Sequence, residues 1–202
     1  MTVKKKASSL FNMVFALFAI TLIAGISLGY VNELTLEPKA RARLERKVNA
    51  LKNVLPAFTN SPVDEAVRLS WEGAPDSLEF YPAMQDSTLV GVAVTGGSEK
   101  GYNGTVRLLV GFNPDGSIRN IAVLEQKETP GLGTKMKGEA FLKQFREKDP
   151  ATFDLRVRKD GGQVDALAGA TISTRAFAEA VQQAYEVYRS QMEGRPNQTR
   201  KP

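Results

Sequence analysis

The sequence predicts an α+β protein, in which one transmembrane helix near the N-terminus precedes a single globular domain built on an antiparallel sheet with flanking helices. Three observations predict this class. Residues 7–32 carry no charged side chain, and the middle of the chain holds short runs of alternating β-branched residues separated by glycine-containing turns. Strand-like and helix-like segments do not alternate as βαβ units, which disfavours a doubly wound sheet. The 202 residues suffice for one domain and an appendage.

The charge-free segment is long enough to cross a membrane. Its apolar centre spans residues 10–31, and roughly 20 helical residues cross a hydrocarbon core about 30 Å thick. A cleaved signal peptide is the alternative, but its apolar region covers only about 7–15 residues and ends at a small-x-small site. The sequence around Gly29 is a poor site of this kind. We therefore expect residues 10–31 to remain as an anchor in contact with membrane lipid.

Charges on either side of the anchor bear on its orientation. Lys4, Lys5 and Lys6 directly precede it and favour a cytoplasmic N-terminus, because positive residues tend to stay on that side. The opposite orientation is favoured by the basic residues beyond the anchor, which are Lys39, Arg41, Arg43, Arg46 and Lys47. The lysines adjoin the apolar run, so we expect residues 1–9 in the cytoplasm. The domain is then expected on the periplasmic, or extracytoplasmic, side of the cell inner membrane.

A helical connector is expected at residues 32–60, between the anchor and the domain. Pro38 suits the first turn of a helix, and Pro56 ends it. Apolar residues follow at spacings of four, three and four and form one stripe, made of Leu44, Val48, Leu51 and Leu55. The domain itself is expected at residues 61–192, and a polar, flexible tail at residues 193–202.

The pattern within the domain predicts an antiparallel meander. Its strands are expected at residues 88–95, 105–112 and 117–124, with a turn at residues 113–116. Gly96 and Gly97 are expected to end the first of these strands. Residues 139–148 follow a helical pattern, residues 153–157 alternate as a further strand with one wet face, and residues 175–192 form the last helix.

Composition excludes several classes of function. The net charge of +5 comes from two tails, since three basic residues lie at 4–6 and three more at 195–201, and the rest of the chain is close to neutral. Because nucleic-acid binding needs a basic face on the folded part, we expect no nucleic-acid partner. The chain has no Cys and no His, which excludes Cys-ligated iron–sulfur clusters, His-ligated haem or zinc, and His-based acid–base catalysis. We expect no metal centre, so any redox chemistry must come from an organic cofactor.

The first candidate site is a loop of small residues before the last helix. It raises the Thr171 hydroxyl to the start of that helix, and Gly169 and Ala170 leave room for a bulky group to approach the backbone. The unpaired N–H groups and positive dipole end of a helix start favour phosphate, and Ser173 and Thr174 add hydroxyl donors. The alternative is that one of these hydroxyls merely caps the helix.

The second candidate site is a Gly-x-Gly loop that follows a strand and precedes a helix. Its backbone could lie flat against a planar ring. It has neither the spacing of a Walker loop nor that of a GxGxxG fingerprint, since position 136 is Met. A simple strand-to-helix turn is the alternative. The residues of this loop are Glu128, Thr129, Pro130, Gly131, Leu132 and Gly133.

The two loops together resemble the FMN-binding domain family. Its flavinylation motif is an Asp, a small residue, a variable residue, usually Ser or Thr, and then Gly-Ala-Thr. Residues 165–171 match this motif, except that Ala168 replaces the usual hydroxyl residue. Over about residues 1–192 the chain is also similar to the G subunits of Rnf ion-translocating electron transport complexes. These share the anchor, the segment 101–104 and the motifs at 128–133, 159–162 and 165–171.

The resemblance implies roles for individual residues. A flavin transferase would join the FMN phosphate to the hydroxyl of Thr171 as a phosphoester, and Asp165 would assist the transferase or orient the loop. The phosphate would be surrounded by Gly169, Ala170, Ser173 and Thr174. The isoalloxazine ring would lie near residues 128–133. The lost hydroxyl at Ala168 could weaken modification or a phosphate contact.

The resemblance also implies a function and its partners. The chain would be an electron-carrying subunit, with no catalytic residue of its own, in a membrane complex that couples electron transfer between ferredoxin and NAD to movement of Na⁺ or H⁺. Its partners would be the other membrane subunits and the flavin transferase. Two alternatives remain open. One is the C subunit of the Na⁺-translocating NADH:quinone reductase, and the other is a flavin-free, membrane-tethered binding or scaffold domain.

Overall fold

The computed structural model describes residues 10–71, 74 and 77–194. The expected cytoplasmic tail at 1–9 and most of the expected flexible tail lie outside these residues. The chain forms two compact units, one up to Glu45 and one from Arg46 on.

A single helix, α1 (Leu10–Val54), contains the expected anchor. Within the described part of the chain it is the one helix long and apolar enough to cross a membrane. Pro38 lies inside α1, whereas the sequence placed it near the first turn of a separate connector helix. Proline removes one N–H donor but keeps a helical φ angle, so the turns on either side continue the helix through it.

The sheet is a five-stranded antiparallel meander, in which each strand pairs with the next one along the chain. The three predicted strands are confirmed as β3, β4 and β5, and two further strands precede them. The strands are β1 (Val67–Leu69), β2 (Leu78–Gln85), β3 (Thr88–Gly101), β4 (Gly104–Phe112) and β5 (Ile118–Glu125). The predicted turn between β4 and β5 is present, with Gly116 at a φ of 93°.

Strand β3 continues through Gly96 and Gly97, so the prediction that these glycines end it was wrong. Helix α3 (Thr171–Glu193) explains the glycine at position 96. A Cβ atom at Gly96 would lie 1.9 Å from the carbonyl oxygen of Ala180 in α3. The pair marks a close approach of helix to strand rather than a turn.

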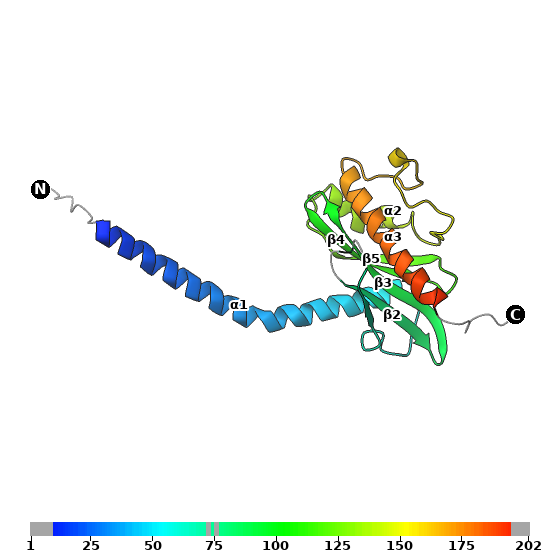
Figure 1. Cartoon of the computed structure of the whole chain (residues 1–202), viewed down its shortest axis with the longest axis horizontal. Coiled ribbons are helices and arrows are strands. Elements are labelled where there is room, and N and C mark those ends of the chain that lie inside the picture. Colours follow the sequence, from blue (N-terminus) through cyan, green and yellow to red (C-terminus); the bar gives the residue numbers. More distant parts are fainter. Residues whose placement is uncertain (1–9, 72–73, 75–76, 195–202) are drawn as a thin grey trace, which may run out of the picture. The chain divides into compact units, whose positions relative to one another are not determined.

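Helical segments cover both faces of the sheet. Helix α3 lies across one face, as Figure 1 shows, and buries Phe177, Val181 and Ala184 in the main core. On the other face, Leu51 and Val54 near the end of α1 belong to a second apolar cluster with residues of β2, β3 and β4. The sheet is therefore buried on two sides within the unit that begins at Arg46.

The segment 139–148 is less helical than its sequence predicts. Its residues Phe141, Leu142 and Phe145 are buried as expected, but the helix α2 covers only Glu139–Leu142. Beyond it, Glu147 donates its N–H to the Ile118 carbonyl over 2.7 Å, and Ile118 donates in turn to the Lys148 carbonyl over 2.8 Å. Pairing with the start of β5 thus replaces further helical turns.

The segment 153–157 is not a strand, although Leu155 and Val157 are buried as its alternation predicts. Its backbone pairs locally instead, through one bridge between Val157 and Val164 and a 3₁₀ turn, η2 (Arg158–Asp160). A second 3₁₀ turn, η1 (Gly133–Lys137), follows the Gly-x-Gly loop. Helix α3 begins at Thr171, four positions before the predicted start at Arg175.

Candidate functional site

Three segments far apart in sequence meet around one pocket. They are the connection between β3 and β4, the loop at 128–133, and the first turn of α3 with the loop before it. The pocket has a volume of about 520 Å³, within the usual range for small-molecule sites. Eight sequence-predicted residues line it, namely Glu128, Thr129, Leu132, Gly133, Gly169, Ala170, Thr171 and Ser173. Both candidate loops therefore belong to one site.

Thr171 is the first residue of α3, and its half-buried side chain lines the pocket. The N-cap position is Ala170, and no side-chain hydrogen bond caps the helix there. The hydroxyls of Thr171, Ser173 and Thr174 therefore do not act as the helix cap. The first backbone bond of the helix runs from the Thr174 N–H to the Ala170 carbonyl. Within the described chain, the N–H groups of Thr171, Ile172 and Ser173 are left without backbone acceptors, as at any helix start.

Thr174 shapes the loop before α3 and does not line the pocket. Its side chain is fully buried, and its hydroxyl donates to the Ala170 carbonyl over 2.9 Å. The hydroxyl oxygen of Thr174 also accepts the N–H of Leu167 over 3.1 Å. Gly169 takes a φ of 72° between these contacts, in the left-handed region that favours glycine. This loop geometry sets Thr171 at the pocket.

Glu128 connects all three segments that form the pocket. Its side chain is only 5% exposed. One carboxylate oxygen accepts the Ser173 hydroxyl over 2.6 Å, and the other accepts the Asn103 N–H over 3.3 Å. Gly133 lies so close that a Cβ atom there would come within 2.7 Å of both Glu128 Cβ and Ser173 Oγ. The second glycine of the Gly-x-Gly loop is required by this contact.

Three other predicted site residues lie outside the pocket lining. Asp165 is exposed, pairs with Arg158 over 2.7 Å and exchanges backbone hydrogen bonds with the Gln144 amide. Pro130 and Gly131 lie on the exposed side of their loop, where Gly131 has a φ of 75°. Asp165 therefore anchors the loop before α3, while Gly131 allows the 128–133 loop to turn.

Comparison with known proteins identifies the domain. A family model described as the FMN-binding domain matches residues 101–186. The G subunit of the ion-translocating oxidoreductase complex of Vibrio cholerae is 30% identical over 197 residues, which cover 92% of this chain and 93% of that protein. The chain belongs to this family of G subunits.

Further relatives also align over most of their length. The G subunit of the ion-translocating oxidoreductase complex of Stutzerimonas stutzeri is 32% identical over 94% of this chain and 83% of its own. The G subunit of the Na⁺-translocating ferredoxin:NAD⁺ oxidoreductase complex of Acetobacterium woodii is 26% identical over 89% of this chain and 92% of its own. A crystal structure of Shewanella oneidensis NqrC aligns with 64% of this chain and 70% of its own, at 22% identity and a TM-score of 0.49.

Two pocket residues of this FMN-binding domain were not predicted as site residues. Tyr102 lies in the short connection between β3 and β4, and Ile172 is the second residue of α3. The signal for Tyr102 was its place in the Gly101–Gly104 segment between two predicted strands. Ile172 could have been found from its position next to Thr171, where an apolar residue faces away from the core.

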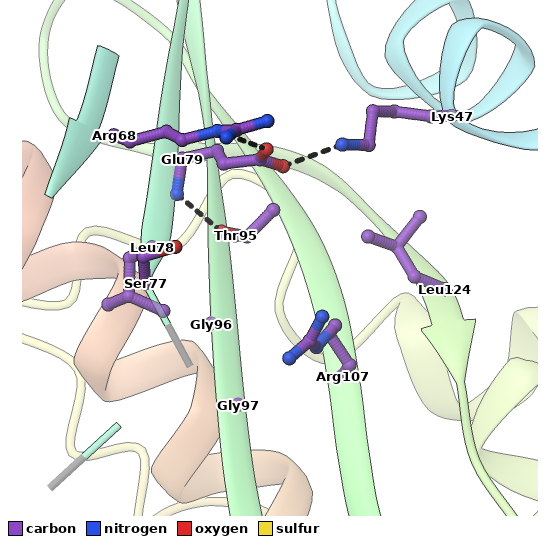
Figure 2. Close-up of a pocket in the computed structure, with 10 residues that line it drawn as sticks. All are labelled: Lys47, Arg68, Ser77, Leu78, Glu79, Thr95, Gly96, Gly97, Arg107 and Leu124. Carbon is purple, nitrogen blue, oxygen red and sulfur yellow. Dashed lines mark hydrogen bonds and ion pairs between the residues drawn. The ribbon is translucent and has the colours of Figure 1, made fainter. Parts of the chain in front are cut away.

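A second, smaller pocket in the domain is lined by charged residues. It has a volume of about 290 Å³, and Figure 2 shows the Glu79 carboxylate between Arg68 and Lys47. The Glu79 carboxylate contacts Lys47 Nζ at 2.7 Å and Arg68 Nε at 3.4 Å. Burial alone would raise the pKa of Glu79, but hydrogen bonds from Lys47 and Tyr81 and the two positive charges outweigh it and hold the pKa below its usual range.

The pKa of the neighbouring Tyr81 is shifted in the opposite direction, upward. Its hydroxyl donates to Glu79, and burial together with this carboxylate raises the tyrosine pKa. Because the Glu79 carboxylate is already held by two cations and a hydroxyl, we assign these four side chains a structural role.

Proposed function

We propose that this protein carries FMN and relays electrons within a membrane complex that couples electron transfer between ferredoxin and NAD to translocation of Na⁺ or H⁺. The observation that carries the proposal is the pocket inside the FMN-binding domain, where the 128–133 loop and the start of α3 meet. The name of the Acetobacterium woodii relative supports the reaction. The chain acts as a subunit of the oxidoreductase and not as the site of hydride transfer.

The proposed cofactor is FMN joined through its phosphate to Thr171. The half-buried hydroxyl lines the pocket and lies beside N–H groups that have no backbone acceptor within the described chain. A helix start of this kind favours a phosphate group. Gly169 has no side chain and Ala170 has only a methyl group, so both leave room for a bulky group to reach Thr171. The pocket volume of about 520 Å³ suits a ligand of the size of FMN.

Attachment would proceed as a transfer of a flavin phosphoryl group to a hydroxyl. The Thr171 oxygen would form a bond to the phosphorus of an activated flavin nucleotide. The bond from that phosphorus to its leaving group would break, and the hydroxyl proton would be lost to a base. A flavin transferase would supply this chemistry, since the described pocket lining contains one buried carboxylate and no Lys or Arg. Asp165, exposed on the loop before Thr171, is available to such an enzyme.

The residues of the pocket position the flavin, which when bound supplies the electron transfer. A covalent link suits this role because a cofactor that changes charge and oxidation state cannot then dissociate. Ser173 and Gly133 both lie against Glu128, whose carboxylate connects the 128–133 loop to α3. The absence of Cys and His from the sequence leaves the flavin as the chain's means of carrying electrons.

We place residues 10–31 in the membrane, the N-terminus in the cytoplasm and the FMN-binding domain on the extracytoplasmic side, where the other membrane subunits and the flavin transferase would meet it. The apolar helix and the preceding lysines support this placement. A protease added to intact spheroplasts should digest the domain. Full protection under those conditions would exclude this orientation.

The attachment residue is tested by flavin fluorescence on a denaturing gel, with the full-length protein produced in a host that has an exported flavin transferase. Thr171→Ala should abolish the fluorescent band, while Thr171→Ser should keep it because the hydroxyl remains. Thr129→Ala is the matched control, since it removes another threonine hydroxyl from the same pocket and should leave the band unchanged. A fluorescent Thr171→Ala band would refute the assignment.

A further inference from the structure

Exposed apolar side chains of the domain gather at one place. Among the described residues from Arg46 on, the large exposed apolar residues are Val67, Tyr102, Leu132 and Ile172. The last three line the same pocket as Thr171, although they come from three separate segments. Their exposed fractions are 65%, 42% and 47%, respectively. Such a cluster on an otherwise polar domain marks a binding surface.

The backbone that carries Tyr102 is held firmly in place. The connection between β3 and β4 turns at Gly104, with a φ of 108°, and a Cβ atom at Gly101 would lie 2.2 Å from the Gly104 carbonyl oxygen. The N–H of Asn103 donates to the buried carboxylate of Glu128, and its side-chain amide donates to Thr129 Oγ1 over 3.4 Å. The tyrosine ring is therefore exposed on a fixed support.

The pocket lining combines polar and apolar groups. Thr171 and the first N–H groups of α3 are polar, while Tyr102, Leu132 and Ile172 present apolar surface. No Lys or Arg belongs to the described lining, so no positively charged side chain of the lining pairs with a ligand there. A flat aromatic group with a polar tail matches this combination, and a tyrosine ring stacks on such a group.

We propose that Tyr102 stacks on the isoalloxazine ring of the flavin attached to Thr171, while Leu132 and Ile172 cover its remaining apolar surface. This inference rests on the proposed function. Tyr102 acts as a residue that touches the cofactor and shields it from water. It also makes the bound flavin weakly fluorescent, because an electron passes from a stacked tyrosine ring to an excited flavin and returns without net reaction.

The experiment compares the full-length protein with Tyr102→Leu and Tyr102→Trp, each produced with a flavin transferase and purified in detergent. Covalent flavin per chain is measured by absorbance after denaturation. Emission per flavin and its quenching by iodide are measured on the folded proteins. Tyr102→Leu should show several-fold brighter emission per bound flavin than the wild type, with stronger iodide quenching, whatever its flavin content. Tyr102→Trp should be no brighter than the wild type, since an indole ring also stacks and quenches.

Each outcome bears on one of the two proposals. Equal emission per flavin from the wild type and Tyr102→Leu would overturn the stacking role and leave the proposed function intact. Wild-type protein without covalent flavin would overturn the proposed function, and the stacking role with it. If Tyr102→Leu fails to fold, Tyr102→Trp decides, because emission well above the wild-type level would contradict stacking. Differences in emission should vanish after denaturation, when the ring and the flavin separate.

Discussion

Glu128 holds its two carboxylate oxygens against different segments of the pocket. One accepts the hydroxyl of Ser173, 45 positions along the chain, and the other accepts the N–H of Asn103. Ser173 is buried as well, so its hydroxyl depends on this carboxylate as its acceptor. The structure thus gives this residue a definite role, linking the loops, in addition to its expected place near the flavin.

Replacement of Glu128 should therefore destabilise the domain. Glu128→Ala leaves the buried Ser173 hydroxyl without its acceptor, which costs about 1–3 kcal/mol in the free energy of unfolding. Glu128→Gln keeps an acceptor oxygen and should cost less. Urea unfolding of the full chain in detergent measures both. Glu99→Ala, at an exposed position of β3, is the control and should change stability by less than about 0.5 kcal/mol. Equal effects of Glu128→Ala and Glu99→Ala would contradict the role.

At the scale of elements, the contact between α3 and β3 determines how the helix lies on the sheet. Gly96 has no side chain at the point where the helix passes close to the strand, and the Gly97 N–H donates to the buried Gln183 side chain over 3.0 Å. A Gly-Gly pair commonly marks a turn, so the local sequence predicts a strand end at these glycines. A close approach by a distant helix leaves the same local signature.

Gly96→Ala should push α3 away from β3. Its Cβ atom would lie 1.9 Å from a backbone oxygen, which cannot move without shifting the helix. Overpacking of this kind costs about 1–3 kcal/mol or more in the free energy of unfolding. Thermal unfolding followed by circular dichroism measures the loss. Gly194→Ala, at an ordinary φ of −75° with its nearest contact at 3.4 Å, should be nearly neutral. A variant at Gly96 as stable as the wild type would show that the helix is not tightly seated.

At the scale of the whole molecule, the folded domain extends into the end of α1. Lys47, on this helix, bonds the Glu79 carboxylate on β2, while Leu51 and Val54 pack beneath the sheet. The same helix thus contains both the apolar segment and a structural part of the domain. The apolar stripe predicted for the connector includes two of the buried residues, Leu51 and Leu55.

The Glu79 cluster should make stability depend on pH. In the folded protein the pKa of Glu79 lies below its unfolded value of 4.5. The stabilisation that Glu79 contributes is therefore fully present above about pH 4.5 and is lost as the pH falls through the folded pKa. Glu79→Gln should therefore lower the unfolding temperature at neutral pH and have a smaller effect at about pH 3. The control is Glu37→Gln, because the Glu37 pair with Arg41 is exposed at 3.9 Å. An effect of Glu79→Gln that is equal at both pH values would disprove the linkage.

The sequence alone was sufficient for features that depend on neighbouring residues. A charge-free run indicated the anchor, alternation indicated β3, β4 and β5, and a small-residue loop before an amphipathic helix indicated the position of Thr171. Helix and strand periods, turns and loop composition are local properties, so they can be read from a window of a few residues. The proposal that Thr171 is the attachment residue came from the resemblance of residues 165–171 to a family motif of the same short length.

Tertiary structure alone decided how these parts combine. It extended β3 past two glycines, stopped α2 at Leu142, and brought Tyr102, Glu128 and Thr171 to one pocket. Each of these results depends on partners far along the chain, such as Ala180 for Gly96, Ile118 for Glu147 and Ser173 for Glu128. Local patterns do not specify such partners. Contacts across long loops form only when the whole domain closes, and their geometry then overrides the local preference of each segment.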